Sequence, residues 1–168
     1  VLGEVNGYPV TRLLETFKDC TKLTKVTLPE NLTAIGNYVF YNCYNLTEID
    51  IPESVTSIGD YALYNCYKLS DITLPDALTR IGEQAFYNCD GIKNLVLPKE
   101  IKEIGYEAFC ACSGITSVTI PGSVTSMGEL VFYQCPNLVE IVFEEGTKTI
   151  FSGVCCECKA LERIVLPE

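Results

Sequence analysis

Apolar and polar positions alternate in short runs that return every 23 residues along the chain. A typical unit, residues 46–67, opens with the pattern L-x-x-I-x-I, in which Glu48 and Asp50 flank an isoleucine. A period of two is typical of a β-strand with one buried face, and the proline that follows ends such a strand because it has no N–H. Residues 55–58 repeat an apolar spacing after the proline. Each unit is therefore predicted to contain a strand and a second extended segment.

The remainder of the unit predicts a corner and a turn. Gly59 offers the permissive backbone that a corner can use. Ala62, Leu63 and Cys66 follow at near-helical spacing, over a segment too short for more than a turn or two. We therefore expect a 3₁₀ or short α-helical turn on the side of the unit opposite the strand.

Cysteine, proline and glycine keep the same 23-residue period in phase with one another. The cysteines are Cys20, Cys43, Cys66, Cys89, Cys112, Cys135 and Cys158. The prolines are Pro29, Pro52, Pro75, Pro98, Pro121 and Pro167, and the glycines are Gly36, Gly59, Gly82, Gly105 and Gly128. A fixed period of 20–50 residues indicates a stacked array. The pattern predicts a repeat solenoid of the leucine-rich-repeat type, a right-handed superhelix with parallel strands on its concave face.

The two ends depart from the pattern. Residues 1–16 fit a degenerate repeat or a cap, in which Val10 and Leu13 replace the 55–58 pair only if one residue is missing. Regular repeats run from about residue 17 to 168. The whole chain, residues 1–168, is expected to be one domain because a single repeat cannot bury its own core. Since the last unit stops after its strand without a polar cap, we expect the chain to be a piece of a longer protein.

Read as L-T-x-I-x-I-P-x-x-V-T-x-I-G-x-x-A-F-x-x-C, the chain resembles the BspA-like leucine-rich-repeat family. The segment SVTSIGDYALYNC, residues 54–66, and its copies carry the resemblance over about residues 17–168. The resemblance implies a secreted or cell-surface protein of a host-associated microbe, with adhesin-like binding of host or matrix proteins. The unit from Phe143 to Cys158 departs from the motif, with Glu144, Thr147 and Phe151 at positions of proline, a β-branched apolar residue and glycine.

Composition narrows the functional classes. The formal net charge of −10 argues against nucleic acid, whose phosphates demand a basic footprint. No apolar run approaches the ~20 residues needed to span a bilayer, so we expect no membrane insertion. The chain has no histidine, no glycine-rich phosphate loop and no nucleophile beside a base, which argues against an enzyme and against a cofactor. A monomer is expected unless the C-terminal end pairs with another chain.

The candidate binding surface is the outward-facing positions of the strands, which vary between units while the core positions do not. Glu48, Asp50 and Asp71 form a predicted acidic centre, and Val142 with Val165 an apolar end. The predicted protein-binding residues are Lys25, Glu48, Asp50, Asp71, Thr73, Asn94, Val96, Ser117, Thr119, Glu140 and Val142. Two alternatives to protein recognition are a structural spacer of a larger surface protein and a thiol-based metal or redox module.

Cysteines and tyrosines are the remaining candidates for chemistry. The in-phase cysteines are predicted to be buried free thiols, because equivalent side chains point the same way at ~4.8 Å rather than at the closer Cβ distance of a disulfide. A disulfide ladder and a metal site remain alternatives. Cys110, Cys155 and Cys156 could add thiolates to such a site. A stripe of tyrosines beside the turn is predicted either to cover the turn or to contact a partner. It comprises Tyr38, Tyr41, Tyr44, Tyr61, Tyr64, Tyr67, Tyr87 and Tyr133.

Overall fold

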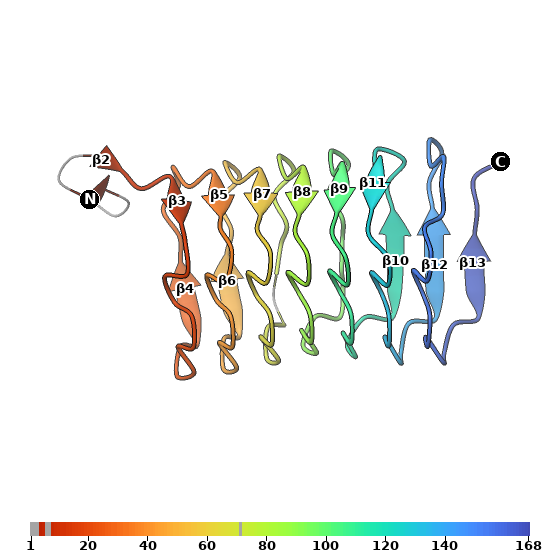
Figure 1. Ribbon diagram of the computed structural model, residues 1–168, viewed down its shortest axis with the longest axis horizontal. Helices are drawn as coiled ribbons and strands as arrows, with labels where there is room; N and C mark the ends of the chain where they lie inside the picture. Colours follow the sequence, from red (N-terminus) through yellow and green to blue (C-terminus); the bar gives the residue numbers. More distant parts are fainter. Residues whose placement is uncertain (1–3, 6–7, 71) are drawn as a thin grey trace.

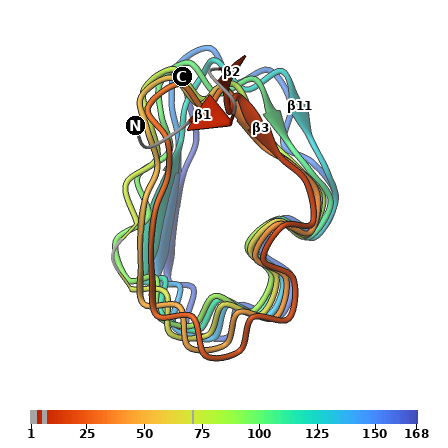
Figure 2. The ribbon, with the colours of Figure 1, turned by 90° about the vertical axis from the view of Figure 1, so that its left-hand side faces the viewer.

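The computed structural model describes residues 4–5, 8–70 and 72–168, and it is a parallel β-solenoid of about 7 turns. Figure 1 shows the turns stacked side by side along the long axis, with the chain ends at opposite ends of the stack. Viewed along the stack, the turns nearly superimpose (Figure 2). The repeat solenoid with parallel strands is confirmed, because consecutive strands of each main sheet pair in parallel across units.

One wall of the solenoid, which we call the strand face, carries the strands predicted from the L-x-x-I-x-I pattern. These are β4 (Lys25–Thr27), β6 (Glu48–Asp50), β10 (Ser117–Ile120), β12 (Glu140–Phe143) and β13 (Arg163–Val165). Paired residues such as Lys25 and Glu48 differ by one period of 23. The alternation predicts the burial correctly, since Val26 and Ile49 are buried between outward-facing neighbours.

A second wall carries a continuous six-stranded parallel sheet. Its strands are β3 (Arg12–Leu13), β5 (Ala34–Ile35), β7 (Ser57–Ile58), β8 (Arg80–Ile81), β9 (Glu103–Ile104) and β11 (Ser126–Met127). Leu13 pairs with Ile35, 22 residues away, so the residue predicted to be missing from the first unit is indeed missing. Before it, β1 (Glu4–Val5) and β2 (Tyr8–Pro9) form an antiparallel pair at the end of the stack.

The strand face is interrupted between β6 and β10. No strand is assigned at residues 72–74 or 94–98, so the strands predicted around Ile72 and Leu95 do not form. In Figure 2 the yellow-green turns bulge outward from this wall. The second wall is interrupted later: residues 147–151, where Thr147 and Phe151 depart from the repeat, form no strand.

The predicted helical turn is wrong, since the described residues contain turns but no helix. Two non-glycine residues of a typical turn, Tyr38 and Asn42, have positive φ angles of 57° and 58°. A right-handed helix needs consecutive negative φ angles, so these two residues interrupt it. Main-chain groups bond instead to the next unit, as when Phe40 N donates to Ala62 O at 2.7 Å. Cross-unit pairing therefore replaces the helix.

The corner glycines serve close packing rather than a positive φ, which corrects the prediction made for Gly59. A Cβ atom on Gly59 would lie 2.4 Å from Asn37 Oδ1 and 2.7 Å from Asn37 N. Only Gly146 and Gly153 have positive φ among the described glycines. The backbones of adjacent units approach too closely at the corner for any side chain.

Candidate functional site

The outward positions of the strand face hold the predicted protein-binding residues. Those that are exposed are Lys25, Asp50, Thr73, Asn94, Val96, Ser117 and Thr119, and those that are half-buried are Glu48, Glu140 and Val142. Asp71 lies outside the described residues. Because one period separates neighbouring units, the structure brings these residues into two rows, with Ser117 beside Glu140 and Thr119 beside Val142.

Ion pairs reduce the acidity predicted for this face. Lys25 Nζ lies 2.5 Å from Glu48 Oε1, and this hydrogen bond raises the pKa of Lys25 above its ordinary value. Glu140 Oε1 lies 2.9 Å from Arg163 Nη1 at the other end of the face. Glu48 and Glu140 are therefore partly neutralised by neighbours on the same surface. Of the predicted acidic centre, Asp50 is the exposed carboxylate that the structure describes.

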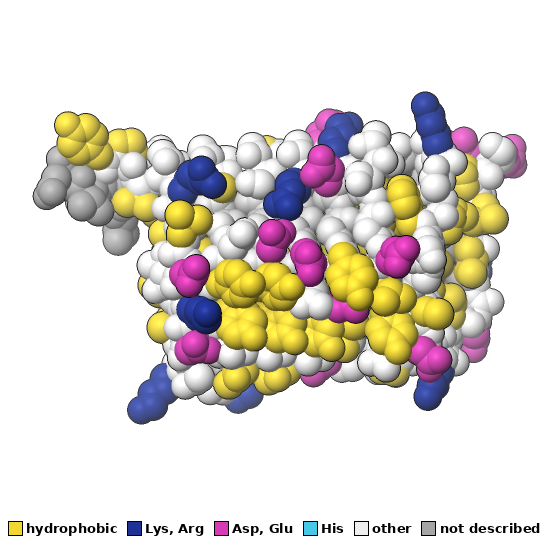
Figure 3. Space-filling view, viewed as in Figure 1, with side chains coloured by type: hydrophobic (Ala, Val, Ile, Leu, Met, Phe, Trp, Pro, Cys, Tyr) yellow, Lys and Arg dark blue, Asp and Glu magenta, His cyan; other side chains and the backbone are white. Residues whose placement is uncertain are grey.

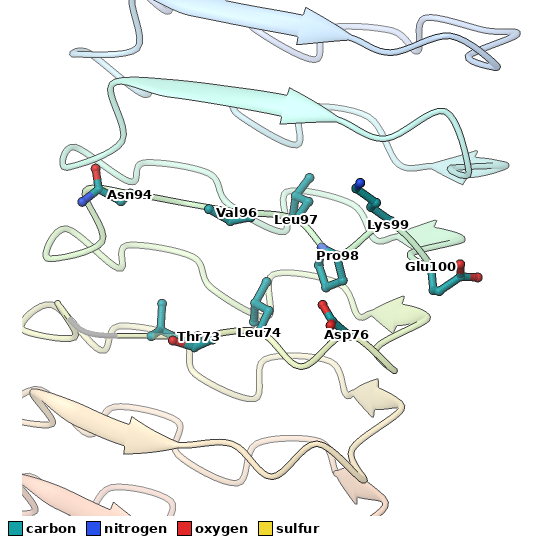
Figure 4. A pocket seen from close by; sticks show the side chains of 10 residues that line it. Thr73, Leu74, Asp76, Asn94, Val96, Leu97, Pro98, Lys99 and Glu100 are labelled. Carbon is teal, nitrogen blue, oxygen red and sulfur yellow. The ribbon is translucent and has the colours of Figure 1, made fainter.

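The interruption of the strand face contains a hollow of about 750 Å³. It lies between two adjacent units, with Thr73, Leu74 and Asp76 on one side (Figure 4). The facing unit supplies Asn94, Val96, Leu97, Pro98, Lys99 and Glu100. Ser70 N still donates to Thr47 O at 3.2 Å, so the main-chain ladder is intact until just before the interruption.

Two smaller hollows extend this one along the face. A hollow of about 480 Å³ shares Thr73 and Asn94 with it and reaches Asp50. Another, of about 360 Å³, shares Val96 and reaches Ser117 and Thr119. We call these three hollows together the strand-face groove. It brings together the predicted residues Asp50, Thr73, Asn94, Val96, Ser117 and Thr119.

The groove also has a rim that the sequence interpretation missed. Glu53, Asp76 and Lys99 line it, directly after the proline of their units. Asp76 N donates to Glu53 Oε2 at 3.2 Å, which ties neighbouring units together. The sequence does contain a signal for this rim: the position immediately after the recurring proline is charged in each of these three units.

Val96 is the most conspicuous apolar group of the groove, with 77% of its surface exposed. It occupies the column of Thr27, Asp50, Thr73 and Thr119, where other units carry mostly polar residues. An exposed aliphatic side chain in a hollow with a polar rim is the arrangement that binding surfaces use.

Within the described ranges, no group of three or more acidic or cysteine side chains has the geometry to hold a metal ion. Likewise, no helix in the described part of the chain has the length and apolarity to span a membrane.

Comparison with known proteins identifies the family. The BspA type leucine-rich repeat region matches six copies, over residues 14–90 and 57–168. The chain belongs to this family. No curated protein sequence matches it at a significant level.

Solved structures extend this BspA-type assignment to the fold. A leucine-rich repeat protein of Bacteroides ovatus is 34% identical, with a TM-score of 0.88 over 95% of this chain and 42% of its own. The T. pallidum leucine-rich repeat protein is 31% identical, with a TM-score of 0.83 over 88% of this chain and 72% of its own. A leucine-rich cell surface protein of Faecalibacterium prausnitzii has 21% identity and a TM-score of 0.54, over 90% of this chain and 62% of its own. This chain thus spans less than half of the Bacteroides protein.

The tyrosines of this BspA-type chain form stacked ladders on the wall opposite the strand face. Tyr64 lies between Tyr41 and Tyr87, at ring-centroid distances of 5.0 Å and 4.7 Å. Tyr38 and Tyr61 stack at 4.9 Å, and Lys18 Nζ lies 5.2 Å from the Tyr38 ring. Figure 3 shows an apolar band over several turns of this wall, with acidic side chains beside it. Neighbouring rings therefore cover one another's faces across successive units.

The in-phase cysteines form an internal ladder, and their predicted burial is confirmed at five positions. Those buried are Cys43, Cys66, Cys89, Cys112 and Cys135, whereas Cys20 is exposed and Cys158 half-buried. Each of the five buried thiols donates to a main-chain carbonyl of the preceding unit, as Cys89 Sγ does to Leu63 O at 3.2 Å. Burial raises the pKa of the Cys43 thiol to about 11 and that of Cys89 well above its ordinary value. All ten cysteines are free thiols.

Proposed function

We propose that this BspA-type solenoid is a non-catalytic recognition module that binds a protein ligand in the strand-face groove. The observation that carries the proposal is the exposed Val96 in a hollow of about 750 Å³ with carboxylates on its rim. Burial of such a side chain stabilises a complex by roughly 1.5–3 kcal/mol, which suffices for an anchor residue. Two other carboxylates of the face, Glu48 and Glu140, are partly neutralised by their ion pairs with Lys25 and Arg163.

The proposal also includes a location for the chain, at the cell surface or secreted, and a class of ligand. The Faecalibacterium relative is described as a cell surface protein, which supports a cell-surface or secreted location for this chain. Host or matrix proteins are the ligands that such a location offers. Because Asp50, Glu53 and Asp76 surround the groove, the ligand is expected to present an apolar side chain beside basic groups. No cofactor is needed, and a monomer is sufficient to bind.

The test is a binding screen of the chain against purified host surface and matrix proteins, measured by biolayer interferometry. Val96→Ser should weaken binding of a specific ligand about tenfold or more, because it removes the apolar anchor. Val139→Ser is the matched control, since Val139 is also exposed but lies outside the groove. Asp76→Lys should lower the association rate and reduce its dependence on salt, whereas Glu129→Lys should not, because the exposed Glu129 lines none of the three hollows.

The competing interpretation is a structural spacer in a larger surface protein. A spacer predicts no specific ligand at any concentration in the screen. A ligand whose affinity is unchanged by Val96→Ser and Asp76→Lys would instead place binding elsewhere, with the tyrosine ladders as the next surface to mutate.

A further inference from the structure

The last turn of the stack carries three thiols, Cys155, Cys156 and Cys158, where the preceding turns carry one or, at Cys110 and Cys112, two. In those turns a bulky apolar residue stands three positions before the in-phase cysteine. That position is Phe17, Phe40, Leu63, Phe86, Phe109 and Phe132 in successive units, and Cys155 in the last. Cys155 and Cys158 both pack against the edge of the core. The substitution of a thiol for an aromatic ring thus creates a Cys-x-x-Cys pair within one turn.

The backbone of this turn brings the pair within bonding range. Cys158 N donates to Cys155 O at 3.2 Å, as Cys43 N does to Phe40 O at 3.1 Å. Glu157, between them, has a positive φ of 61°. A turn closed in this way holds its first and last Cα atoms within ~7 Å, and a disulfide spans Cα separations of ~4.4–6.8 Å. Neighbouring ladder cysteines lie in different units, and each of them, like Cys158, donates to a main-chain carbonyl.

The thiols of this turn differ from the buried ladder in their accessibility and chemistry. Cys155 and Cys158 are half-buried and Cys156 is exposed, whereas the ladder from Cys43 to Cys135 is buried. The neighbouring Cys135 and Cys155 thiols hold the pKa of Cys158 below its ordinary value. The neighbouring Cys158 thiol and burial raise the pKa of Cys155. Cys158 is therefore the nucleophile of the pair, because the thiolate is the reactive form.

We propose that Cys155 and Cys158 are a redox-active dithiol that closes to a disulfide by exchange with a small-molecule disulfide of the glutathione type. The Cys158 thiolate attacks one sulfur of the small disulfide, forms a mixed disulfide and releases one small thiolate. Cys155 then loses its proton to solvent and attacks Cys158 Sγ, which releases the second small thiolate. Two protein thiols are oxidised and one small disulfide is reduced to two thiols. This reaction is independent of ligand binding in the strand-face groove.

The experiment incubates the folded chain with oxidised glutathione, blocks all free thiols in denaturant, and then reduces and labels the remainder with a second reagent. Tryptic cleavage after Lys148 and Lys159 isolates residues 149–159, which contain Cys155, Cys156 and Cys158. Mass spectrometry should find the second label on Cys155 and Cys158 and the first on Cys156. Thiols in the peptide of residues 26–68, which holds Cys43 and Cys66, should carry no second label, which confirms that the chain stays folded.

Two variants separate the pair from its neighbour. Cys155→Phe restores the residue type of the other turns and so keeps the packing, but it should abolish the disulfide. Cys156→Ser should form the disulfide as fully as the unmodified chain. The proposal is overturned if the peptide keeps three free thiols, if it carries only a glutathione adduct, or if a disulfide within the peptide persists in Cys155→Phe.

Discussion

At the residue scale, each buried thiol has two roles. It fills the core, as a valine would, and it donates a hydrogen bond, as a serine would. The Cys66 side chain fills the core, with no exposed surface, and donates to Phe40 O at 3.3 Å. The same arrangement recurs at Cys112, whose Sγ lies 3.0 Å from Phe86 O. A thiol is a small apolar group with a weak donor, so it suits a column that must be dry and still satisfy a carbonyl.

This ladder predicts a loss of stability at alkaline pH. Burial raises the pKa of the Cys43 thiol to about 11, above the value of ~8.5 expected for an unfolded thiol. The folded state then holds the proton more tightly, so the stabilisation is present below pH ~8.5 and is lost as pH rises towards 11. Each such thiol changes the free energy of unfolding by up to ~1.4 kcal/mol per pH unit in this window.

Chemical denaturation at successive pH values from 8 to 10, below the range in which Tyr61 and Tyr87 titrate at a pKa of about 12, measures this slope. Cys66→Ala combined with Cys89→Ala should reduce it. A stability that stays constant over this range would contradict the burial of the ladder in solution.

The residue scale also shows what the sequence could reveal about the site. The strand pattern placed Thr73, Asn94 and Val96 on the surface because alternation alone decides which way a side chain points. It missed the partnership of Lys25 with Glu48, because an ion pair depends on side-chain geometry between units. It also predicted a flexible role for Gly59, where close approach of two backbones is the actual constraint.

At the element scale, the tyrosine ladders should contribute to stability through stacking. Tyr64 has stacked partners on both sides, whereas Tyr67 stacks on Tyr44 alone and is 38% exposed. Each aromatic pair contributes ~0.5–1.5 kcal/mol beyond its buried area. Tyr64→Ala should therefore lower the free energy of unfolding by ~3–5 kcal/mol, in the range of large aromatic truncations.

Urea denaturation of Tyr64→Ala, Tyr67→Ala and Tyr64→Phe provides the measurement. Tyr67→Ala is the matched control and should cost clearly less, while Tyr64→Phe keeps the stack and should stay close to the parent. Equal losses for Tyr64→Ala and Tyr67→Ala would show that stacking between units contributes little.

Elements were predictable where packing alone determines them and not where main-chain pairing between units intervenes. The six short strands of the second wall follow from the spacing of apolar residues such as Val55 and Ile58. The conformation of the turn did not follow from the sequence. The near-helical spacing of Ala62, Leu63 and Cys66 is equally compatible with main-chain hydrogen bonds between units. Positive φ at Tyr61 and Asn65 was not visible in the side-chain pattern. Nor did the columns of Ile72 and Leu95 reveal the interrupted strand face.

At the scale of the whole molecule, the single-domain organisation remains a prediction, and it can be tested through cooperativity. Most tyrosines lie between Tyr38 and Tyr106, so near-ultraviolet circular dichroism reports mainly on the N-terminal half. Hydrogen exchange of β10 and β12 reports on the other half. One domain predicts that both probes unfold at the same denaturant concentration, since each unit is stable only against its neighbours. Two separate unfolding transitions would show that the stack contains more than one domain.

The interrupted strand face also has a mechanical consequence. Between the unit of Thr73 and the unit of Val96, the β8–β9 pairing of the second wall continues while the strand pairing of the strand face stops. A stack joined along one wall bends most easily about that wall, as a book opens about its spine. Tension applied to the two ends is therefore borne unequally along the stretch from β6 to β10, and we expect the strand face to separate there first. Stiffness in this molecule is a local property, lowest where the strand face is interrupted.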